Sequence, residues 1–445
     1  MKSKWVTFIS AGIIVLGCVL VLTSLPGRDP DGSPENEVLL VQTGWTSEAE
    51  TIGLAELQRL YCSGQLAATE TAGANASRRF GCNPKANAIT PAAFYPNSKN
   101  RLILVSLPES IPQMKHIFID GISFFKDSQR YPLTAPAAGQ IRSQVSHFIL
   151  TGVSALTRYT GKSADANGPN ILSQRIKPYF ADADYVHVSN EVSFTNPCVF
   201  APGTRFCSKE AHFQAFKDIR ANVVELTGNH NRDFGNESFM ETYKWFQKNG
   251  LKAFGGGRTE DEANQPLILP LKSGTLALIG FNELCPLGEC ASANIPGANR
   301  YNADKARSAI ANIRKKYPGA FIIATVQFGE VNSYQPTANQ RAISNSLLDF
   351  GADLVYGSQA HQVQQMEFSK GKILLHGLGN FFFDQTHTFG LRQGYFMNFY
   401  FFKGKLVSMQ PVFTWIDEKY RPVPADAAQT KQIKESIYSD SLLYK

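Results

Sequence analysis

A histidine and an asparagine lie side by side on a glycine-led loop near the middle of the chain. Residues 228–235 read Gly-Asn-His-Asn-Arg-Asp-Phe-Gly and follow the apolar run 222–227, which is typical of a buried strand. An imidazole on such a loop can ligate a metal ion or act as a general acid or base. The alternative is a turn whose asparagine caps the next helix and whose histidine packs locally. The segment is therefore a candidate for metal binding or proton transfer.

Four further apolar runs end in polar residues in the same way. The runs 184–189, 321–326, 354–358 and 373–378 lead into Asn190-Glu191, Gln327 to Glu330, Gln359-Ala360-His361 and Gly379-Asn380. Segments with helical spacing lie between the runs, at 213–220, 239–248, 303–316 and 342–350. This alternation predicts an α/β domain with parallel strands. Ligands of such sheets gather beyond the carboxyl ends of the strands, so we expect all five strand ends to form one site.

The ionisable residues at these ends are the candidate catalytic groups. They are Glu191, His230, Glu330 and His361. Either histidine can serve as a metal ligand or as a general acid, and either carboxylate as a base. For each of the four, a purely structural role is the alternative.

Five further residues are candidates for substrate binding. Arg158 can clamp a phosphate or carboxylate through two hydrogen bonds, and Asn282 follows the apolar run 276–281 at the expected rim. Asn190, Gln327 and Gln359 supply neutral amides at strand ends. His187 and His376 lie inside apolar runs, which favours buried structural roles for them.

Length and composition limit the class of protein. A chain of 445 residues, 43% hydrophobic and 18% charged, is globular and long enough for two or three domains. The net charge of +7 is spread without a long block of one sign. Because the sequence has no basic stripe with interleaved aromatic residues, we expect no nucleic-acid partner. A mildly basic exterior suits an anionic polymer or an anionic membrane surface.

The N-terminus predicts a membrane anchor at residues 1–27. Lys2 and Lys4 precede an uncharged apolar run from Val6 to Leu25, and acidic residues dominate the segment after that run. Twenty helical residues span about 30 Å, the thickness of the hydrocarbon core. The lysines place the start inside the cell, so we expect a single-pass protein of the cell membrane whose bulk is extracytoplasmic. A cleaved signal peptide and a lipoprotein signal at Cys18 are the alternatives.

The other six cysteines fall as close neighbours in the sequence. These neighbours are Cys62 with Cys82, Cys198 with Cys207, and Cys285 with Cys290. An even count in an exported chain predicts disulfides, and the short separations favour these pairings. A zinc site is the alternative, but no Cys-x-x-Cys spacing is present.

The rest of the chain divides into three parts. Residues 28–140 predict a small α/β lobe, in which 54–65, 118–123 and 131–133 resemble part of a periplasmic phosphate-type binding protein. A spacer or docking lobe is the alternative. Residues 145–415 form the main domain, and 416–445 a polar C-terminal tail.

The strand-end motifs together resemble a known family. Ser189-Asn190-Glu191, the Gly-Asn-His loop, 327–330, 357–361 and 378–385 occur in the order seen in CapA, or poly-γ-glutamate capsule synthesis, proteins. The resemblance spans roughly residues 147–385. These proteins are built on the calcineurin-like metallophosphoesterase fold, so the resemblance implies a four-layer αββα sandwich of two mixed sheets.

The sequence departs from that family at the metal ligands. Val153 stands where a Gly-Asp motif is usual, Gln327-Phe328-Gly329 where His-Trp-Gly is common, and 357–361 lacks the first histidine of Gly-His-x-Pro-His. The ligands that remain are Glu191, Asn229, His230 and His361. A two-metal centre needs carboxylates and imidazoles to balance its charge, so the sequence disfavours one. A single divalent ion (manganese, zinc or magnesium) and a metal-free site stay open.

The resemblance implies a role in an anionic capsular polymer such as poly-γ-glutamate. We expect a membrane-anchored, extracytoplasmic protein that acts in synthesis, export or attachment of the polymer, beside a membrane-bound synthesis complex. An active enzyme would be a hydrolase or transferase of the metallophosphoesterase-like superfamily. A catalytically degenerate module that binds polymer or protein, and a metal-dependent phosphoesterase, are the alternatives.

Overall fold

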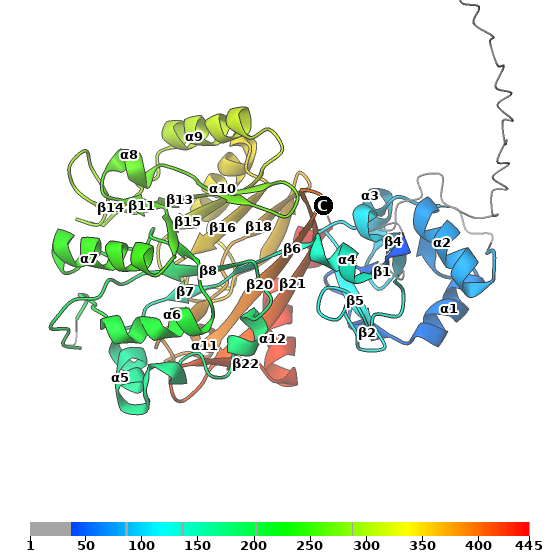
Figure 1. Cartoon of the computed structure of the whole chain (residues 1–445), viewed down its shortest axis with the longest axis horizontal. Coiled ribbons are helices and arrows are strands. Elements are labelled where there is room, and N and C mark those ends of the chain that lie inside the picture. The colour runs from blue at the N-terminus through cyan, green and yellow to red at the C-terminus, as the bar shows by residue number, and fades with distance from the viewer. Residues whose placement is uncertain (1–36, 85–87, 135–137, 201–202, 287, 445) are drawn as a thin grey trace, which may run out of the picture.

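The computed structural model describes residues 37–84, 88–134, 138–200, 203–286 and 288–444, which form a small N-terminal lobe and a larger domain (Figure 1). Within these ranges no helix combines the length and apolar character needed to cross a bilayer. The predicted anchor at residues 1–27 lies outside the described residues.

The N-terminal lobe is a five-stranded sheet with helices beside it. The strand order is β2 (Thr51–Ile52), β5 (Lys115–Ile119), β1 (Leu39–Thr43), β4 (Ile103–Ser106) and β3 (Ala67–Ala68). The helices are α1 (Leu54–Cys62), α2 (Glu70–Phe80), α3 (Pro91–Phe94) and α4 (Ala138–Ser143). Thr69 begins α2 by accepting a hydrogen bond from the Ala72 N–H, and Gly81 ends it with a positive φ of 67°.

The first sheet of the larger domain mixes parallel and antiparallel strands. Its order is β10 (Lys252–Phe254), β9 (Val223–Glu225), β8 (Tyr185–Asn190), β6 (Ser146–Leu150), β20 (Gln393–Phe402), β21 (Lys405–Ile416) and β22 (Pro422–Pro424), with β7 (Val153–Ser154) and β19 (Asn380–Phe382) joined through β8. Strands β6, β8, β9 and β10 run parallel, whereas β20 pairs with its neighbours antiparallel.

The second sheet is parallel at its centre and antiparallel at both edges. Its order is β12 (Leu267–Pro270), β13 (Thr275–Asn282), β15 (Phe321–Gln327), β16 (Leu354–Ser358), β18 (Lys372–Leu375) and β17 (Met366–Ser369). A short ribbon of β11 (Gly256–Gly257) and β14 (Gly297–Ala298) stands apart.

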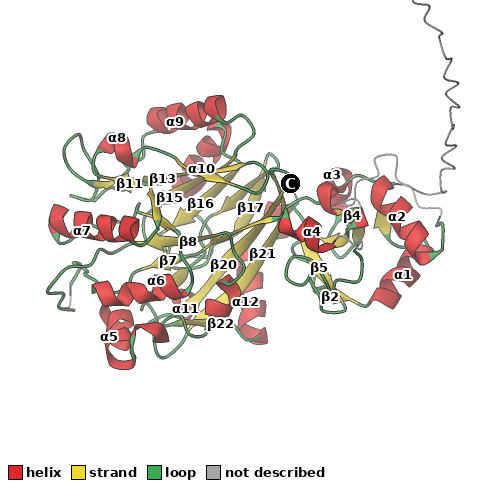
Figure 2. Cartoon of the chain, viewed as in Figure 1, coloured by secondary structure: helices red, strands yellow, loops and turns green. Residues whose placement is uncertain are grey.

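The two sheets pack face to face, and helices cover their outer faces (Figure 2). One core lies between the sheets; a second lies under α5 (Arg158–Asn167), α6 (Gln214–Asp218) and α7 (Gly235–Lys248), and a third under α9 (Ala303–Lys316) and α10 (Ala338–Phe350). The short helices α8 (Glu260–Ala263) and α11 (Phe389–Arg392) complete the domain. Strand β20 is buried along its whole length, and most of its side chains are apolar or aromatic. The predicted α/β fold with mixed sheets is confirmed.

The C-terminal segment, predicted as a polar tail, folds onto both parts of the molecule. It forms β22, α12 (Ala427–Ile437) and α13 (Asp440–Leu443). Ile433, Ile437 and Leu443 are buried in the core between the sheets. The Tyr444 hydroxyl lies 3.1 Å from the Thr46 hydroxyl of the lobe. The end of the chain therefore closes over the junction between lobe and domain.

The lobe and the domain share a core. Tyr400, Phe402 and Val407, from β20 and β21, belong to the apolar cluster of the lobe. The Phe125 ring stacks on the Tyr400 ring with 4.5 Å between centroids. Because apolar packing continues across the junction, the two parts form one body.

Three disulfides join Cys62 to Cys82, Cys198 to Cys207 and Cys285 to Cys290, which confirms the predicted pairings. Each bond ties a local loop, and such bonds are typical of chains that fold in an oxidising compartment.

Candidate functional site

A network of side-chain amides joins the two sheets at the carboxyl ends of their strands. Gln327 ends β15, and its Nε2 lies 3.0 Å from Oε1 of Glu191 and 3.1 Å from Oδ1 of Asn229. The same nitrogen also donates to Oε1 of Gln359. Glu191 follows β8, Asn229 follows β9 and Gln359 follows β16. We call these four residues the amide cluster; the structure thus brings four of the five predicted strand ends together.

Three residues of the amide cluster are buried, Asn229 is half-buried, and the central amide is fully occupied. Glu191 and Gln327 are each 2% exposed and Gln359 is 4% exposed. The Ser358 hydroxyl donates to Oε1 of Gln327 over 2.6 Å. Both ends of the Gln327 amide are therefore used within the protein.

His361 lies beside this cluster and connects the fifth strand end to it. Its Nδ1 lies 2.8 Å from Oδ1 of Asn380, whose amide nitrogen donates to the Leu391 carbonyl. Because the Asn380 oxygen faces the ring, Nδ1 carries a proton and donates it. On the other side of the ring, Nε2 lies 3.3 Å from Oε1 of Glu330. Gln385 also donates to this oxygen, over 3.0 Å.

His361 and Glu330 form a charged pair. Burial works against protonation of His361, but the hydrogen bond to Glu330 and the charge of Glu191 outweigh it, so the pKa of His361 is raised. The hydrogen bond from His361 in turn lowers the pKa of Glu330 to about 2. Each group thus favours the charged form of the other.

His230 is held in a similar way. Its Nδ1 lies 2.8 Å from Oδ2 of Asp233, and this carboxylate also accepts the Phe206 N–H over 2.6 Å. Burial opposes protonation here too, but Asp233 and the charge of Glu191 raise the pKa of His230. Asp233 therefore orients the imidazole and does not cap α7, which has no side-chain cap.

Arg158 lies between the two histidines through a pair of phenylalanines. Its guanidinium carbon is 4.9 Å from the centroids of both Phe206 and Phe383. The Phe206 ring contacts His230, and the Phe383 ring contacts His361. Nε of Arg158 lies 3.1 and 3.2 Å from the two carboxylate oxygens of Asp384. This ion pair already balances the charge of Arg158.

The polar groups of Asn190 and Asn282 bind the framework. Nδ2 of Asn190 donates to Oδ1 of Asn231 over 2.9 Å. Nδ2 of Asn282 donates to the Thr227 carbonyl over 2.7 Å, and its Oδ1 accepts the Cys285 N–H over 2.6 Å. Asn282 therefore fixes two loops instead of facing the amide cluster. The Oδ1 atom of Asn190 is buried without a hydrogen-bond partner in the described structure.

Glu289 is a residue at this site that no sequence motif singled out. It lies in the loop closed by the disulfide between Cys285 and Cys290, is 5% exposed, and accepts the Arg232 N–H over 3.0 Å. Burial raises its pKa to about 7, close to the pH at which a proton donor must work. Its carboxylate lies within electrostatic reach of His230. The available signal was a carboxylate between two cysteines five positions apart in the sequence, just after a predicted strand end.

The backbone that presents His361 is strained. Gln359 has a φ of 75° and His361 a φ of 55°, a left-handed conformation that costs side chains other than glycine free energy. Such strain persists where the surrounding contacts fix it, and it is concentrated at functional sites. Here the bonds to Gln327 and Asn380 fix it.

The residues at the site do not fit the metal centre that the fold family implies. No three His, Cys, Asp or Glu side chains of the described residues are grouped so as to hold a metal ion. Val153 occupies the first ligand position and is buried in β7. The N–H groups of Gln327 point at the oxygens of Glu191 and Asn229 that a cation would need. The donor set therefore supports hydrogen bonding and proton transfer by the protein's own side chains.

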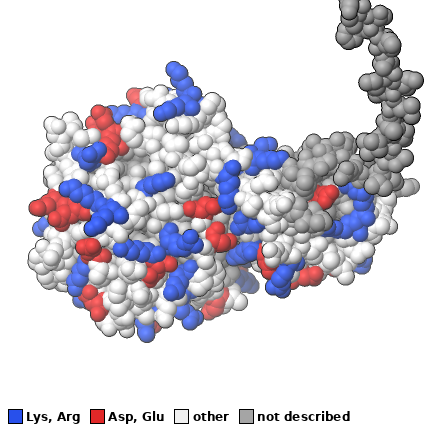
Figure 3. Space-filling view, in the orientation of Figure 1, with Lys and Arg blue, Asp and Glu red and all other residues white. Residues whose placement is uncertain are grey.

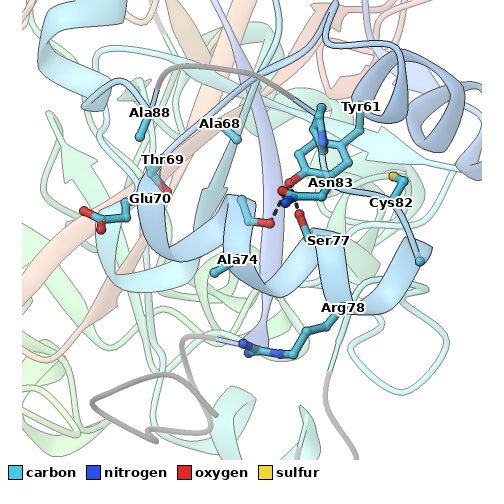
Figure 4. Close-up of a pocket in the computed structure, with 13 residues that line it drawn as sticks. Tyr61, Ala68, Thr69, Glu70, Ala74, Ser77, Arg78, Cys82, Asn83 and Ala88 are labelled. Carbon is cyan, nitrogen blue, oxygen red and sulfur yellow. Dashed lines mark hydrogen bonds between the residues drawn. The ribbon is translucent and has the colours of Figure 1, made fainter. Parts of the chain in front are cut away.

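Charged side chains are distributed over one face of the molecule (Figure 3), and one of its cavities lies in the N-terminal lobe. Basic and acidic side chains intermix over the face shown in Figure 3. A cavity of about 580 Å³ in the N-terminal lobe is lined by α2 and the chain beside it (Figure 4). There the Tyr61 hydroxyl bonds the Gly73 carbonyl and Ser77, and the Thr69 hydroxyl bonds Glu109. These polar groups are thus used within the lobe.

Comparison with known proteins gives consistent matches over the larger domain. The family model described as bacterial capsule synthesis protein PGA_cap matches residues 147–385, more than half of the chain. The PGA biosynthesis protein CapA of Bacillus subtilis is 26% identical over 239 residues, 52% of this chain and 61% of that protein. The capsule biosynthesis protein CapA of Bacillus anthracis is 24% identical over 271 residues, 58% of this chain and 65% of that protein. The matched region thus covers less than two thirds of either relative.

Solved structures with a similar arrangement are more distant. The NAD nucleotidase of Haemophilus influenzae aligns with a TM-score of 0.36 and 11% identity over 66% of this chain and 62% of that one. A 5'-nucleotidase precursor of Thermus thermophilus aligns with a TM-score of 0.37 and 11% identity over 66% and 58%. On the sequence match to residues 147–385, the chain belongs to the bacterial capsule synthesis protein family.

Proposed function

We propose that this protein acts in the synthesis, export or attachment of an anionic capsular polymer such as poly-γ-glutamate. Its family membership and the names of its Bacillus relatives support this role. The three disulfides support a location outside the cytoplasm. In this proposal residues 1–27 anchor the protein in the cell membrane as a single-pass segment, next to the synthesis machinery.

The observation that carries the chemistry is the pair of carboxylate-bound histidines around Glu191. His361 is paired with Glu330, His230 is paired with Asp233, and the charge of Glu191 acts on both imidazoles. Two imidazoles whose raised pKa favours the protonated form suit a substrate rich in carboxylates. Bound substrate displaces Glu330 from Nε2 of His361, which then donates a proton to the leaving group as the amide or phosphoester bond breaks. Water, or an acceptor hydroxyl or amine in a transfer, forms the new bond and gives its proton to Glu191. The proposed enzyme is a hydrolase or transferase that works through its own side chains.

A polymer-binding module is the second candidate. The amide cluster favours it, because Glu191, the best-placed base, already accepts a hydrogen bond from Gln327. In this version the histidines and Arg158 bind polymer carboxylates, and no bond is broken.

Conservative substitution of the histidines tests the proposal. We would replace His230→Gln and His361→Gln together in the full-length protein and measure capsular polymer on cells and polymer binding by purified protein. The exposed His387→Gln is the matched control. Loss of capsule with intact fold and retained binding supports catalysis, and loss of both supports the binding module. An unchanged capsule would rule out a role for either histidine.

A further inference from the structure

The centre of the amide cluster has more hydrogen-bond acceptors than hydrogens. A primary amide nitrogen carries two hydrogens. Nε2 of Gln327 nevertheless has three side-chain oxygens around it, from Glu191, Asn229 and Gln359. Three oxygens from three loops converging on one point is the arrangement expected around a hard cation.

From this geometry we propose that the Gln327 amide is a built-in substitute for a divalent cation. It draws together loops of both sheets and offsets part of the charge of the buried Glu191 carboxylate. The proposal concerns how the site is assembled, so it stands independently of the reaction or polymer proposed above.

The orientation of the amide is fixed by its surroundings. Ser358 donates to Oε1 over 2.6 Å, which leaves Nε2 to face the three oxygens. The reversed amide would set Oε1 against the Glu191 carboxylate and expose four oxygens to one another. Without a cation between them, that arrangement is electrostatically unfavourable. The hydrogen-bond network therefore favours the orientation in which Nε2 faces the Glu191 carboxylate.

A change of Gln327 to a residue of nearly the same shape should turn this position into a metal ligand. Gln327→Glu replaces the donor nitrogen by an oxygen and leaves the side-chain shape almost unchanged. The cluster then has two carboxylates, at 191 and 327, and two amide oxygens, at 229 and 359. Oxygen donors of this kind are the preferred ligands of manganese, magnesium and calcium.

The test measures metal content and thermal unfolding of the full-length protein in detergent. After chelation, we expect millimolar manganese to leave the unfolding temperature and the metal content of the wild-type protein unchanged. The Gln327→Glu protein should unfold at a lower temperature in chelator, gain several degrees with manganese, and retain about one manganese per chain, because a ligand that binds only the folded state stabilises it.

Two controls separate cation binding from the general effect of a buried charge. The exchange variant Glu191→Gln with Gln327→Glu keeps one carboxylate facing one amide, so it should regain stability and lose the manganese response. Gln340→Glu adds a carboxylate at another buried glutamine. Nε2 of Gln340 lies 2.9 Å from Oε1 of Gln364, and the Gln364 amide can rotate to donate a hydrogen bond to the new carboxylate. It should not bind manganese.

Several results would overturn the proposal. One is stoichiometric manganese on the wild-type protein; another is a Gln327→Glu protein as stable as wild type and indifferent to manganese. If Gln327→Glu fails to fold, recovery of folded protein by the added Glu191→Gln exchange supports the proposal, and failure of that rescue overturns it.

Discussion

Glu330 and His361 form an ion pair between an exposed carboxylate and a buried imidazole. The two atoms, Oε1 and Nε2, lie 3.3 Å apart; the Glu330 side chain is 63% exposed and that of His361 4%. Glu330 can therefore move away into solvent, whereas Asn380 keeps the ring in place. If Glu330 moves away, Nε2 of His361 can donate its proton to a bound substrate.

Glu330→Gln should lower the pKa of His361. The carboxylate raises that pKa through a hydrogen bond and through its charge, and both effects end with the substitution. Loss of the adjacent opposite charge should therefore lower the pKa of His361. Nuclear magnetic resonance titration of the histidine ring protons measures it directly. An unchanged titration curve for His361 would contradict the pairing.

Asp233→Asn should have the corresponding effect on His230. The carboxylate accepts the Nδ1 proton over 2.8 Å and raises the pKa of the ring. The amide keeps the shape but not the charge, so the pKa should fall and capsule yield should fall with it. The same titration, with His361 as the internal reference, checks this prediction. A drop in capsule yield without a change in titration would instead indicate a structural role for Asp233.

Glu289→Gln should stabilise the protein, and the gain should grow with pH. Burial raises the pKa of Glu289 from 4.5 to about 7, so the folded protein holds this proton more tightly than the unfolded chain does. Glu289 therefore does not lower the free energy of unfolding below pH 4.5. It lowers that free energy increasingly as the pH rises from 4.5 to about 7. Above pH 7 the substitution should raise the free energy of unfolding by up to roughly 3 kcal/mol.

Urea unfolding at acidic and alkaline pH measures this difference. Glutamine retains an oxygen for the Arg232 N–H, so that hydrogen bond should survive. The exposed Glu241→Gln is the control, with no pH-dependent gain expected. Equal effects of Glu289→Gln at both pH values would refute the raised pKa.

Phe402→Ala should destabilise the lobe and the larger domain together. The ring is 2% exposed and packs in the core of the lobe, although it belongs to β20 of the larger domain. Truncation of a buried phenylalanine costs about 3–5 kcal/mol. Calorimetry should show one unfolding transition, shifted as a whole, while Val199→Ala, at a residue 74% exposed, leaves it in place. Two transitions, of which only one moves, would show that the parts unfold separately.

The sequence predicted the arrangement of the strands better than the details of the side chains. Apolar runs ending in Asn-Glu, Gly-Asn-His, Gln-Phe-Gly-Glu and Gln-Ala-His placed four strand ends correctly because the edge of a parallel sheet is set by backbone topology. The helix predicted over 303–316 has those bounds in the structure. Its start is marked by Asn302, which accepts hydrogen bonds from the N–H groups of Asp304 and Lys305.

The features that the sequence patterns did not predict depend on tertiary packing. Helix α12 in the polar end of the chain buries only a narrow stripe, Ile433 and Ile437, which is too sparse to predict a docked helix. Helix α10 begins four residues before the predicted 342, at the Thr337 capping box with Gln340. The hydrogen bonds of Gln327 depend on loops from two sheets, and no spacing along the chain encodes them.

Strand β20 connects the candidate site with the N-terminal lobe. Gly394, near its start, pairs through Gly379 with the segment that carries Asn380, and Phe402 at its end lies in the core of the lobe. Ten residues of extended chain measure roughly 33 Å. Because this strand is buried along its whole length, it acts as a rigid connection. The position of the lobe therefore fixes the distance and direction of His361 from any surface that the lobe contacts.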